Sequence, residues 1–432
     1  MSDRWDREQV LGLAPDAPSA KAAGGVAKPG KWAATGCDGE AVWGECQGSG
    51  KSAYRTCADL TEPAFRCSCP SRKFPCKHAL GLLLLWADGT VDTGPRPGWA
   101  AEWIEERRER ADKAARRKAV PAAKTKDPKT VERRERRVDD GLAELDQWLR
   151  DQVAHGLAQA EKASYRLWDD AARRLVDAQA GSLAGQVRGL AAIPRQPGWP
   201  DRLLEEYALL RLLVRAYGRR DELPEGLRDT VRSRVGFTVP QEEVLAAGER
   251  VRDRWWVTGS RDTAQDLLTT RRVWLLGRRT RRPALVLSFA APGTSLDASL
   301  IVGTEIDAEL AYYPGSPPLR ALVAERHGAV AQGRPEGTSV QGFLDEHAAA
   351  VARDPWLDRW PATLENVRLA RAAGGGLAVV DGAGGALPLR LGDPWRLLAL
   401  SGGGPVTIAG EWSPRGLRPL AAWHDDEGSV VL

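Results

Sequence analysis

All six cysteines of this 432-residue chain fall within 40 consecutive residues, and this clustering constrains the possible folds more than any other feature. The six positions are Cys37, Cys46, Cys57, Cys67, Cys69 and Cys76. The N-terminus, Met1 to Glu8, is charged where a secretory signal needs an apolar core, so we expect a cytoplasmic protein whose thiols stay reduced. The cysteines are therefore expected to serve as thiols or metal ligands and not as a disulfide scaffold.

Three of these cysteines and one histidine lie within twelve residues in the spacing C-x-C-x6-C-x-H, as Cys67, Cys69, Cys76 and His78. Zinc prefers four tetrahedral nitrogen and sulfur ligands, and a Cys3His set saturates the ion without leaving a position for water. Alternate residues of a strand face the same side, so Cys67 and Cys69 can both face one ion. The sequence therefore predicts one Zn2+ with a structural and not a catalytic role.

Four cations surround the predicted ligands, and no acidic residue lies between positions 66 and 78. These cations are Arg66, Arg72, Lys73 and Lys77. Three thiolates and one divalent ion carry a net negative charge, which neighbouring cations stabilise. Two other interpretations of the motif are reduced, buried cysteines beside an unrelated histidine, and an iron–sulfur cluster, whose usual ligands are four thiolates.

The spacing of the four ligands, preceded by a predicted β-hairpin and followed at once by an apolar helix, resembles the SWIM-type zinc finger. The flanking runs, Trp43 to Gly50 and Phe74 to Leu84, look like those of bacterial stand-alone members of that family. The resemblance covers about residues 37–90. It implies a DNA-binding or protein-interaction module, and bacterial members also resemble accessory subunits encoded beside AAA ATPases and von Willebrand-type domains. An AAA ATPase is therefore one expected partner.

The pattern of apolar residues predicts an α+β multidomain protein. A small ββ(β)α zinc-finger module is expected within residues 1–104, with its core at 37–90, and a basic charged linker at 105–137. A helical domain is expected at 138–250, and a β-rich domain at 251–432 with helices near 319–328 and 340–353. The densest apolar run, Ala79 to Ala87, is far shorter than the roughly 20 residues of a membrane span, so no such span is expected.

The segment 105–137 carries 14 basic and seven acidic residues and two prolines. Its cations could neutralise several phosphates together with the basic loop at 66–77. The interleaved acids also fit a solvated helix with i,i+4 ion pairs, which would have no ligand at all. Both interpretations remain open at this point.

Other motifs are predicted to carry no chemistry. Gly44 to Ser52 ends like a phosphate loop, but Glu45 stands where that loop requires glycine, so we expect no nucleotide site. Cys37, Cys46 and Cys57 lack partners for a second metal site and are expected to be buried or half-buried thiols. The zinc site leaves no open position, so we expect no enzymatic activity; a catalytic alternative would depend on Glu305 or Asp307.

Two functions then compete. In the first, a zinc-stabilised module binds nucleic acid, and Arg66, Arg72, Lys73 and Lys77 contact phosphates. In the second, the protein is an accessory subunit that binds a protein partner such as an AAA ATPase and has no direct contact with nucleic acid.

Overall fold

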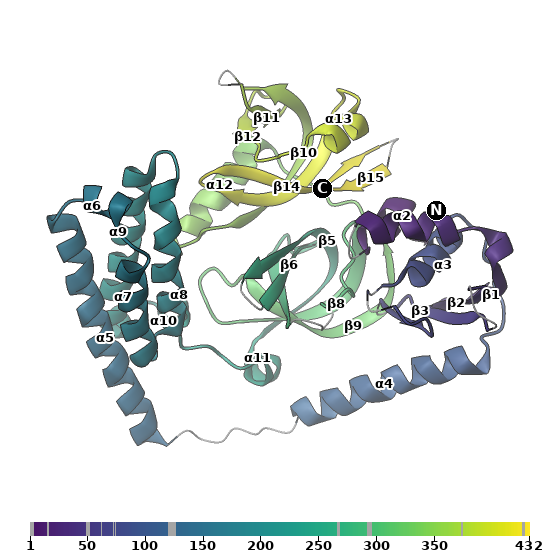
Figure 1. Ribbon diagram of the computed structural model, residues 1–432, viewed down its shortest axis with the longest axis horizontal. Coiled ribbons are helices and arrows are strands. Elements are labelled where there is room, and N and C mark those ends of the chain that lie inside the picture. Colours follow the sequence, from purple (N-terminus) through teal and green to yellow (C-terminus); the bar gives the residue numbers. More distant parts are fainter. Residues whose placement is uncertain are drawn as a thin grey trace.

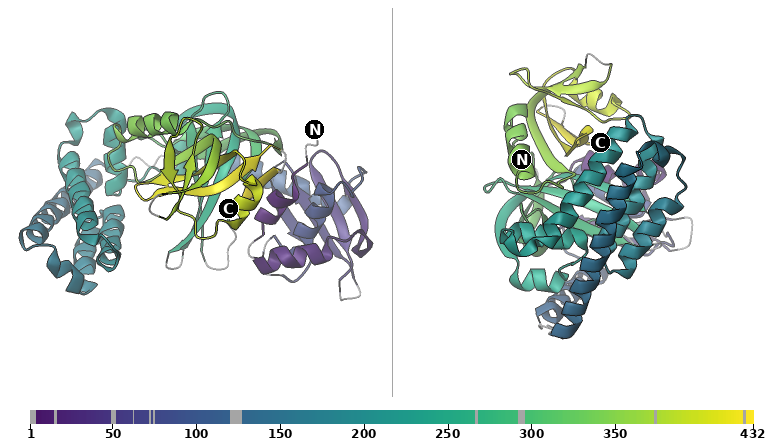
Figure 2. Two further views of the ribbon diagram at one scale, coloured as in Figure 1. Left: turned by 90° about the horizontal axis from the view of Figure 1, so that it is seen from above. Right: turned by 90° about the vertical axis from the view of Figure 1, so that its left-hand side faces the viewer.

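The computed structural model describes residues 4–14, 17–48, 52–61, 63–71, 73, 75–119, 127–265, 268–291, 296–372, 375–425 and 428–432. Four parts follow one another along the chain: an N-terminal module, a helical bundle, a β-barrel and a C-terminal sheet (Figure 1). The N-terminal module and the bundle lie at opposite ends, with both β parts between them (Figures 1 and 2). The expected α+β multidomain fold is confirmed.

The N-terminal module contains a four-stranded antiparallel sheet in the order β1-β2-β3-β4. Its elements are α1 (Arg7–Gly12), α2 (Ala17–Val26), the 3-10 turn η1 (Pro29–Lys31), β1 (Trp32–Cys37), β2 (Ala41–Cys46), β3 (Tyr54–Asp59), β4 (Ala64–Cys67), α3 (Lys77–Ala87) and α4 (Gly98–Ala119). The predicted hairpin is β2 and β3, and β4 is the predicted third strand. β1 is an additional strand that no sequence pattern predicts.

The helix α3 is the core of this module. It is buried continuously from His78 to Trp86, because the sheet covers one side and α1 and α2 cover another. A helix that is apolar all round is stable only where neighbours surround it. Gly81 permits the closest of these contacts, since a Cβ at that position would lie 2.6 Å from Cγ2 of Val26.

The bundle packs its helices around one apolar core. Its elements are α5 (Pro128–Ala154), α6 (Ala158–Lys162), α7 (Arg166–Asp177), α8 (Gly181–Gly189), η2 (Leu190–Arg195), α9 (Trp199–Gly218), η3 (Arg220–Glu222) and α10 (Glu225–Val235). On α5, Leu142, Leu145 and Leu149 recur at helical spacing and are buried, as the sequence pattern predicts. Trp148 packs edge-on against Trp168 of α7 in the same core.

The segment predicted as a charged linker, residues 105–137, is helical at both of its described ends. Residues 105–119 continue α4, and residues 128–137 form the start of α5. Ala100 and Trp103 of α4 pack with Trp43 of the sheet, so α4 is attached to the N-terminal module. The expected boundaries at 104/105 and 137/138 therefore fall inside these two helices.

After α11 (Gln241–Ala247), five strands close into a barrel in the order β5-β6-β7-β9-β8. They are β5 (Glu249–Gln265), β6 (Leu268–Gly277), β7 (Pro283–Ala290), β8 (Thr304–Tyr312) and β9 (Arg320–Gln332). The helix predicted near 319–328 is wrong, because β9 occupies that segment. Leu319, Leu322 and Val323 recur at helical spacing, but β9 pairs with both β8 and β7 and so removes two unpaired sheet edges.

The C-terminal sheet has six strands in the order β12-β11-β10-β13-β14-β15. They are β10 (Trp360–Arg371), β11 (Leu377–Val380), β12 (Ala386–Pro388), β13 (Val406–Ser413), β14 (Gly416–His424) and β15 (Gly428–Val431). α12 (Val340–Val351) and α13 (Trp395–Ser401) pack on it, and α12 confirms the helix predicted at 340–353.

Both ends of the molecule are anchored to the central β parts. Ile301, which precedes β8, is buried in the core of the N-terminal module, and Gln9 of α1 donates a hydrogen bond to the carbonyl of Gly303 at 2.6 Å. Trp356, which precedes β10, is buried in the bundle core.

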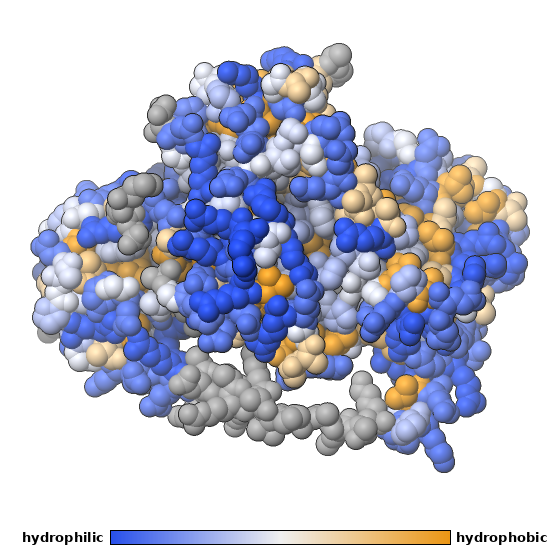
Figure 3. Space-filling model, turned by 180° about the vertical axis from the view of Figure 1, so that it is seen from behind, coloured by the Kyte–Doolittle hydropathy of each residue, from blue (hydrophilic) through white to orange (hydrophobic). Residues whose placement is uncertain are grey.

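Seen from behind, hydrophilic residues gather over the centre, and apolar residues form separate patches on the flanks (Figure 3). Among the described residues, no helix combines the length and apolar composition that a bilayer span requires.

Candidate metal centre

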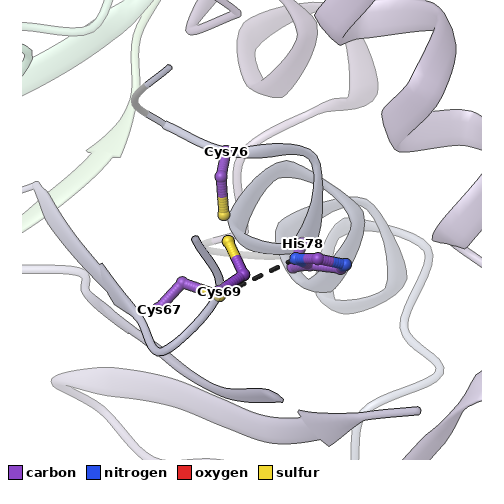
Figure 4. Close-up of side chains that lie close together, drawn as sticks. All are labelled: Cys67, Cys69, Cys76 and His78. Atoms are coloured by element: carbon purple, nitrogen blue, oxygen red, sulfur yellow. Dashed lines mark hydrogen bonds between the residues drawn. The ribbon is translucent and has the colours of Figure 1, made fainter. Parts of the chain in front are cut away.

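The end of β4 and the start of α3 bring the four predicted ligands together (Figure 4). Cys67 is the last residue of β4, Cys69 follows it, Cys76 caps α3, and His78 lies in the first turn of that helix. Their donor atoms all lie within 4.8 Å of one another, and Cys67 Sγ is 3.8 Å from Nδ1 of His78. Zn–S bonds of about 2.3 Å place tetrahedral sulfur ligands about 3.8 Å apart. These donors therefore need only a small contraction to hold zinc.

The centre is shielded from water mainly on its helical side. Cys76 and His78 are 1% and 5% exposed, whereas Cys67 and Cys69 are half-buried. Three thiols and an imidazole are the soft donors that zinc prefers, and four of them complete its tetrahedral shell. The donor set therefore fits a closed, structural site.

Two residues of β3 support the ligands although no sequence motif marks them. Thr56 is the ladder partner of Cys67, and its Oγ1 lies 3.2 Å from Cys67 Sγ. The ring of Tyr54 packs against the His78 imidazole with centroids 5.0 Å apart. Such outer contacts fix the orientation of metal ligands. The sequence placed both residues on a strand. The β3–β4 register brings Thr56 to the site, and packing against His78 of α3 brings Tyr54 there.

The thiols strongly affect one another's protonation. Hydrogen bonding from Cys76, assisted by His78, lowers the pKa of Cys67 to about 3. The same contact raises the pKa of Cys76, and burial raises the pKa of Cys69. Because zinc binds thiolates, its binding must release the protons of Cys69 and Cys76.

The cations predicted to flank the site lie on its exposed side where the structure describes them. Arg66 on β4, Lys73 in the connecting loop and Lys77 at the start of α3 are all exposed. Arg66 and Lys77 form no ion pair with any described carboxylate. Arg72 lies outside the described residues.

The other three cysteines are buried in the module. Burial raises the pKa of Cys57 to about 12 and also raises that of Cys46, so both thiols stay protonated and unreactive. Cys37 Sγ lies 3.6 Å from the carbonyl of Val91. Within the described part of the chain, no second group of three or more potential metal ligands comes together.

The basic segment divides between the two interpretations that the sequence left open. On α4, Arg107 pairs with Asp59 at 3.2 Å and Arg108 pairs with Glu40 at 2.6 Å, so these cations attach the helix to the sheet. On α5, Arg133 and Arg137 form no ion pair with the described residues. Arg107 and Arg108 of α4 are therefore structural, whereas Arg133 and Arg137 of α5 are available to a ligand.

The acids of the catalytic alternative form ion pairs on the barrel. Glu305 pairs with Arg254 at 2.6 Å and with Arg278 at 3.3 Å, and Asp307 pairs with Arg252 at 3.3 Å. In the segment that ends like a phosphate loop, Gly44 lies inside β2, and residues 49–51 lie outside the described residues.

Two family models match parts of the chain. Residues 66–87, which contain all four ligands, match the SWIM zinc finger, and residues 133–235 match the SWIM-associated four-helix bundle domain, over α5 to α10. No curated protein and no solved structure matches the chain. The resemblance seen in the sequence is thus confirmed. The chain carries a SWIM zinc finger, whose Cys3His site holds one structural Zn2+, together with a SWIM-associated four-helix bundle domain.

Proposed function

We propose that the protein is a non-catalytic nucleic-acid-binding protein whose zinc finger presents cations to phosphates. The observation that carries this proposal is the exposure of Arg66, Lys73 and Lys77 beside a closed metal centre, in a segment without an acidic residue. Zinc ties together the strand and the helix that carry these side chains, so it presents them in a fixed arrangement. Arg72, in the same loop, is expected to add a fourth contact.

The closed zinc shell supports a non-catalytic role. Catalytic zinc keeps an open position for water or substrate, whereas four protein ligands fill this one. The same ion stabilises the fold, since structural zinc contributes about 10–16 kcal/mol in small fingers. Nucleic-acid binding is therefore expected to depend on zinc indirectly, through the folded module.

The test is fluorescence anisotropy of a random-sequence DNA duplex with the full-length protein over a range of salt concentrations. Neutralising about four phosphates predicts a slope of about −3.6 for the logarithm of affinity against the logarithm of salt. Lys77→Gln and Arg66→Gln should each reduce that slope by about one. Lys21→Gln is the matched control, because Lys21 is an exposed lysine of α2 outside the finger. Equal slopes for Lys77→Gln and Lys21→Gln would contradict the proposal.

A protein-interaction role, with a partner such as an AAA ATPase, is the second candidate. Trp395 of α13 favours it, because this side chain is 73% exposed and tryptophan is enriched at protein interfaces. Partner capture that survives nuclease treatment and is lost in Trp395→Ala, without salt-dependent DNA binding, would favour this candidate over the first.

A further inference from the structure

A second group of cations lines a cavity of the helical bundle. The bundle lies at the opposite end of the molecule from the N-terminal module, which contains the zinc ligands (Figure 1). The cavity has a volume of about 570 Å³, and no carboxylate is among the described residues that line it. Those that carry the argument are Arg133, Arg134, Arg137, Gln179, Arg232 and Phe237. The first three come from α5 and Arg232 comes from α10, so folding assembles the site from segments about 100 residues apart.

The ring of Phe237 orients two of the four guanidinium groups. Arg134 and Arg232 lie over this ring, with guanidinium carbons 4.3 Å and 4.4 Å from its centroid. Arg134 Nη2 also donates a hydrogen bond to the carbonyl of Gly236 at 3.0 Å. These contacts hold the guanidinium groups in place, which lowers the entropy cost of binding a ligand.

One buried hydrogen-bond donor of the cavity's lining is satisfied by no described protein group. Arg134 Nε is buried and has no hydrogen-bond partner. A buried donor on a charged group is costly when it lacks an acceptor. Arg232 is the only one of the four arginines with a carboxylate partner among the described residues, Glu135 at 2.8 Å.

Arg133 and Arg137 repel each other electrostatically, and a bound anion would remove this repulsion. They are four residues apart on α5 and line the same cavity, and like charges at this spacing destabilise a helix. A bound anion would turn this repulsion into attraction.

We propose that the cavity binds a small, multiply charged phosphate anion. The planar guanidinium fork matches phosphate oxygens with two parallel hydrogen bonds, and several such forks favour a polyvalent anion over a single carboxylate. The volume lies in the range of small-molecule sites. Phe237 already carries two guanidinium groups, so the site offers phosphate contacts and not a free ring for stacking a base.

A neighbouring cleft shows why the anion belongs in this cavity. The cleft, of about 400 Å³, lies between the bundle and the barrel and shares Arg232 and Phe237 with the cavity. Asp229, Asp354 and Asp358 are among its lining residues. Its cations are therefore largely balanced within the protein, whereas Arg133, Arg134 and Arg137 have no carboxylate partner among the described residues.

The test is isothermal titration of the full-length protein with inorganic pyrophosphate at low salt. The proposal predicts binding at one site, and Arg133→Gln and Arg137→Gln should each weaken it about tenfold, the effect of one charge-assisted hydrogen bond. Arg136→Gln is the matched control, because Arg136 is exposed on the same helix, pairs with Glu132 and does not line the cavity. Thermal unfolding verifies that each variant is folded.

Two outcomes would overturn the existence of an anion site in this cavity, and a third would overturn its assignment to phosphate. One is no pyrophosphate binding by the wild-type protein, and the other is equal weakening by Arg136→Gln and Arg137→Gln. Citrate should bind at least tenfold more weakly, and equal affinity for citrate would overturn the assignment to phosphate. Lys77→Gln should bind pyrophosphate normally, so this site and the proposed nucleic-acid function can fail separately.

Discussion

Cys69 is the ligand that ties the loop after β4 to the metal. Cys69→Ser should lose zinc, because a hydroxyl is a poor ligand for this ion. Without zinc, residues 37–90 should unfold, whereas the bundle should stay folded, because its buried core contains no residue before Val138. Metal analysis and amide hydrogen exchange measure the two effects.

Cys37→Ser is the control and should keep zinc, since Cys37 is buried but is not a ligand. Unchanged zinc content in Cys69→Ser would exclude this ligand set.

Glu411 of β13 is a second residue whose charge matters, because it joins the barrel to the C-terminal sheet. It is 3% exposed, accepts a hydrogen bond from Trp274 Nε1 at 3.0 Å, and pairs with Arg272 at 3.2 Å. Arg261 and Arg359 pair with it at 3.4 Å each. Glu411→Gln leaves Arg261 and Arg272 without a carboxylate partner among the described residues, and Arg359 with only Asp358. We therefore expect a loss of about 3 kcal/mol at pH 7, measured by urea unfolding.

The same carboxylate predicts a pH dependence. Burial alone would raise the pKa of Glu411, but Trp274 and the three guanidinium groups outweigh it and hold the pKa below the ordinary value of 4.5. A lowered folded-state pKa stabilises the fold above 4.5, and this stabilisation is lost as the pH falls through the folded-state value. The stability gap between wild type and Glu411→Gln should therefore close below about pH 4.5. Glu222→Gln, which removes an exposed partner of Arg219, should leave the Tm unchanged. A gap that persists in acid would contradict the assignment.

At the scale of single residues, the sequence predicts those functional residues that lie close together in the chain. Cys67, Cys69, Cys76 and His78 form a local motif whose chemistry is specific, so all four could be named. Thr56 and Glu411 could not, because their roles depend on the register of strands and on contacts between parts of the fold.

At the scale of elements, the crossing of α2 and α3 depends on the missing side chain of Gly81. In Gly81→Ala the new methyl group would clash with Val26, so the zinc module should lose about 1–2 kcal/mol despite the better helix propensity of alanine. Gly185 of α8 is the matched control, since a Cβ there meets no atom within 4 Å. Gly185→Ala should therefore stabilise the bundle by about 0.5–1 kcal/mol. Thermal unfolding measures both changes in stability. A Gly81→Ala variant more stable than the wild-type protein would contradict the close crossing of α2 and α3.

Elements with a strong local pattern were predicted, and elements that depend on distant partners were not. β2, β3, α3 and α12 follow from alternation or from helical spacing. β1 has the sequence Trp-Ala-Ala-Thr-Gly-Cys, which shows little alternation, and it forms because β2 offers a free edge. The apolar spacing at β9 predicts a helix, whereas pairing with β8 and β7 makes the segment a strand.

At the scale of the whole molecule, Trp356 connects the bundle to the β parts, together with the ion pair between Arg234 and Asp354 at 2.7 Å. Trp356 is buried in the bundle core and donates a hydrogen bond to the carbonyl of Leu209 at 2.8 Å. Trp356→Ala should cost about 3–5 kcal/mol and make the bundle unfold separately, visible as two calorimetric transitions. Trp395→Ala, at an exposed position, should leave the transition unchanged. A single, unshifted transition in Trp356→Ala would show that other contacts hold the bundle.

The arrangement of the four parts of the fold is the feature that the sequence predicts least well. The charged segment 105–137 looked like a linker because it has few large apolar residues, yet its ends belong to α4 and α5. The role of each cation depends on neighbours that are distant in the sequence. Arg107 and Arg108 pair with acidic residues of the N-terminal module, whereas Arg134 lines the cavity with Arg232 and Phe237. No local pattern contains that information.

The zinc centre supports both the fold of the N-terminal module and its proposed function, so the metal content of the purified full-length protein tests the account most directly. Native mass spectrometry of protein purified without added metal should show one zinc ion per chain, released on acidification as the thiolates protonate. A folded protein without zinc, or with an iron–sulfur cluster in its place, would contradict the account.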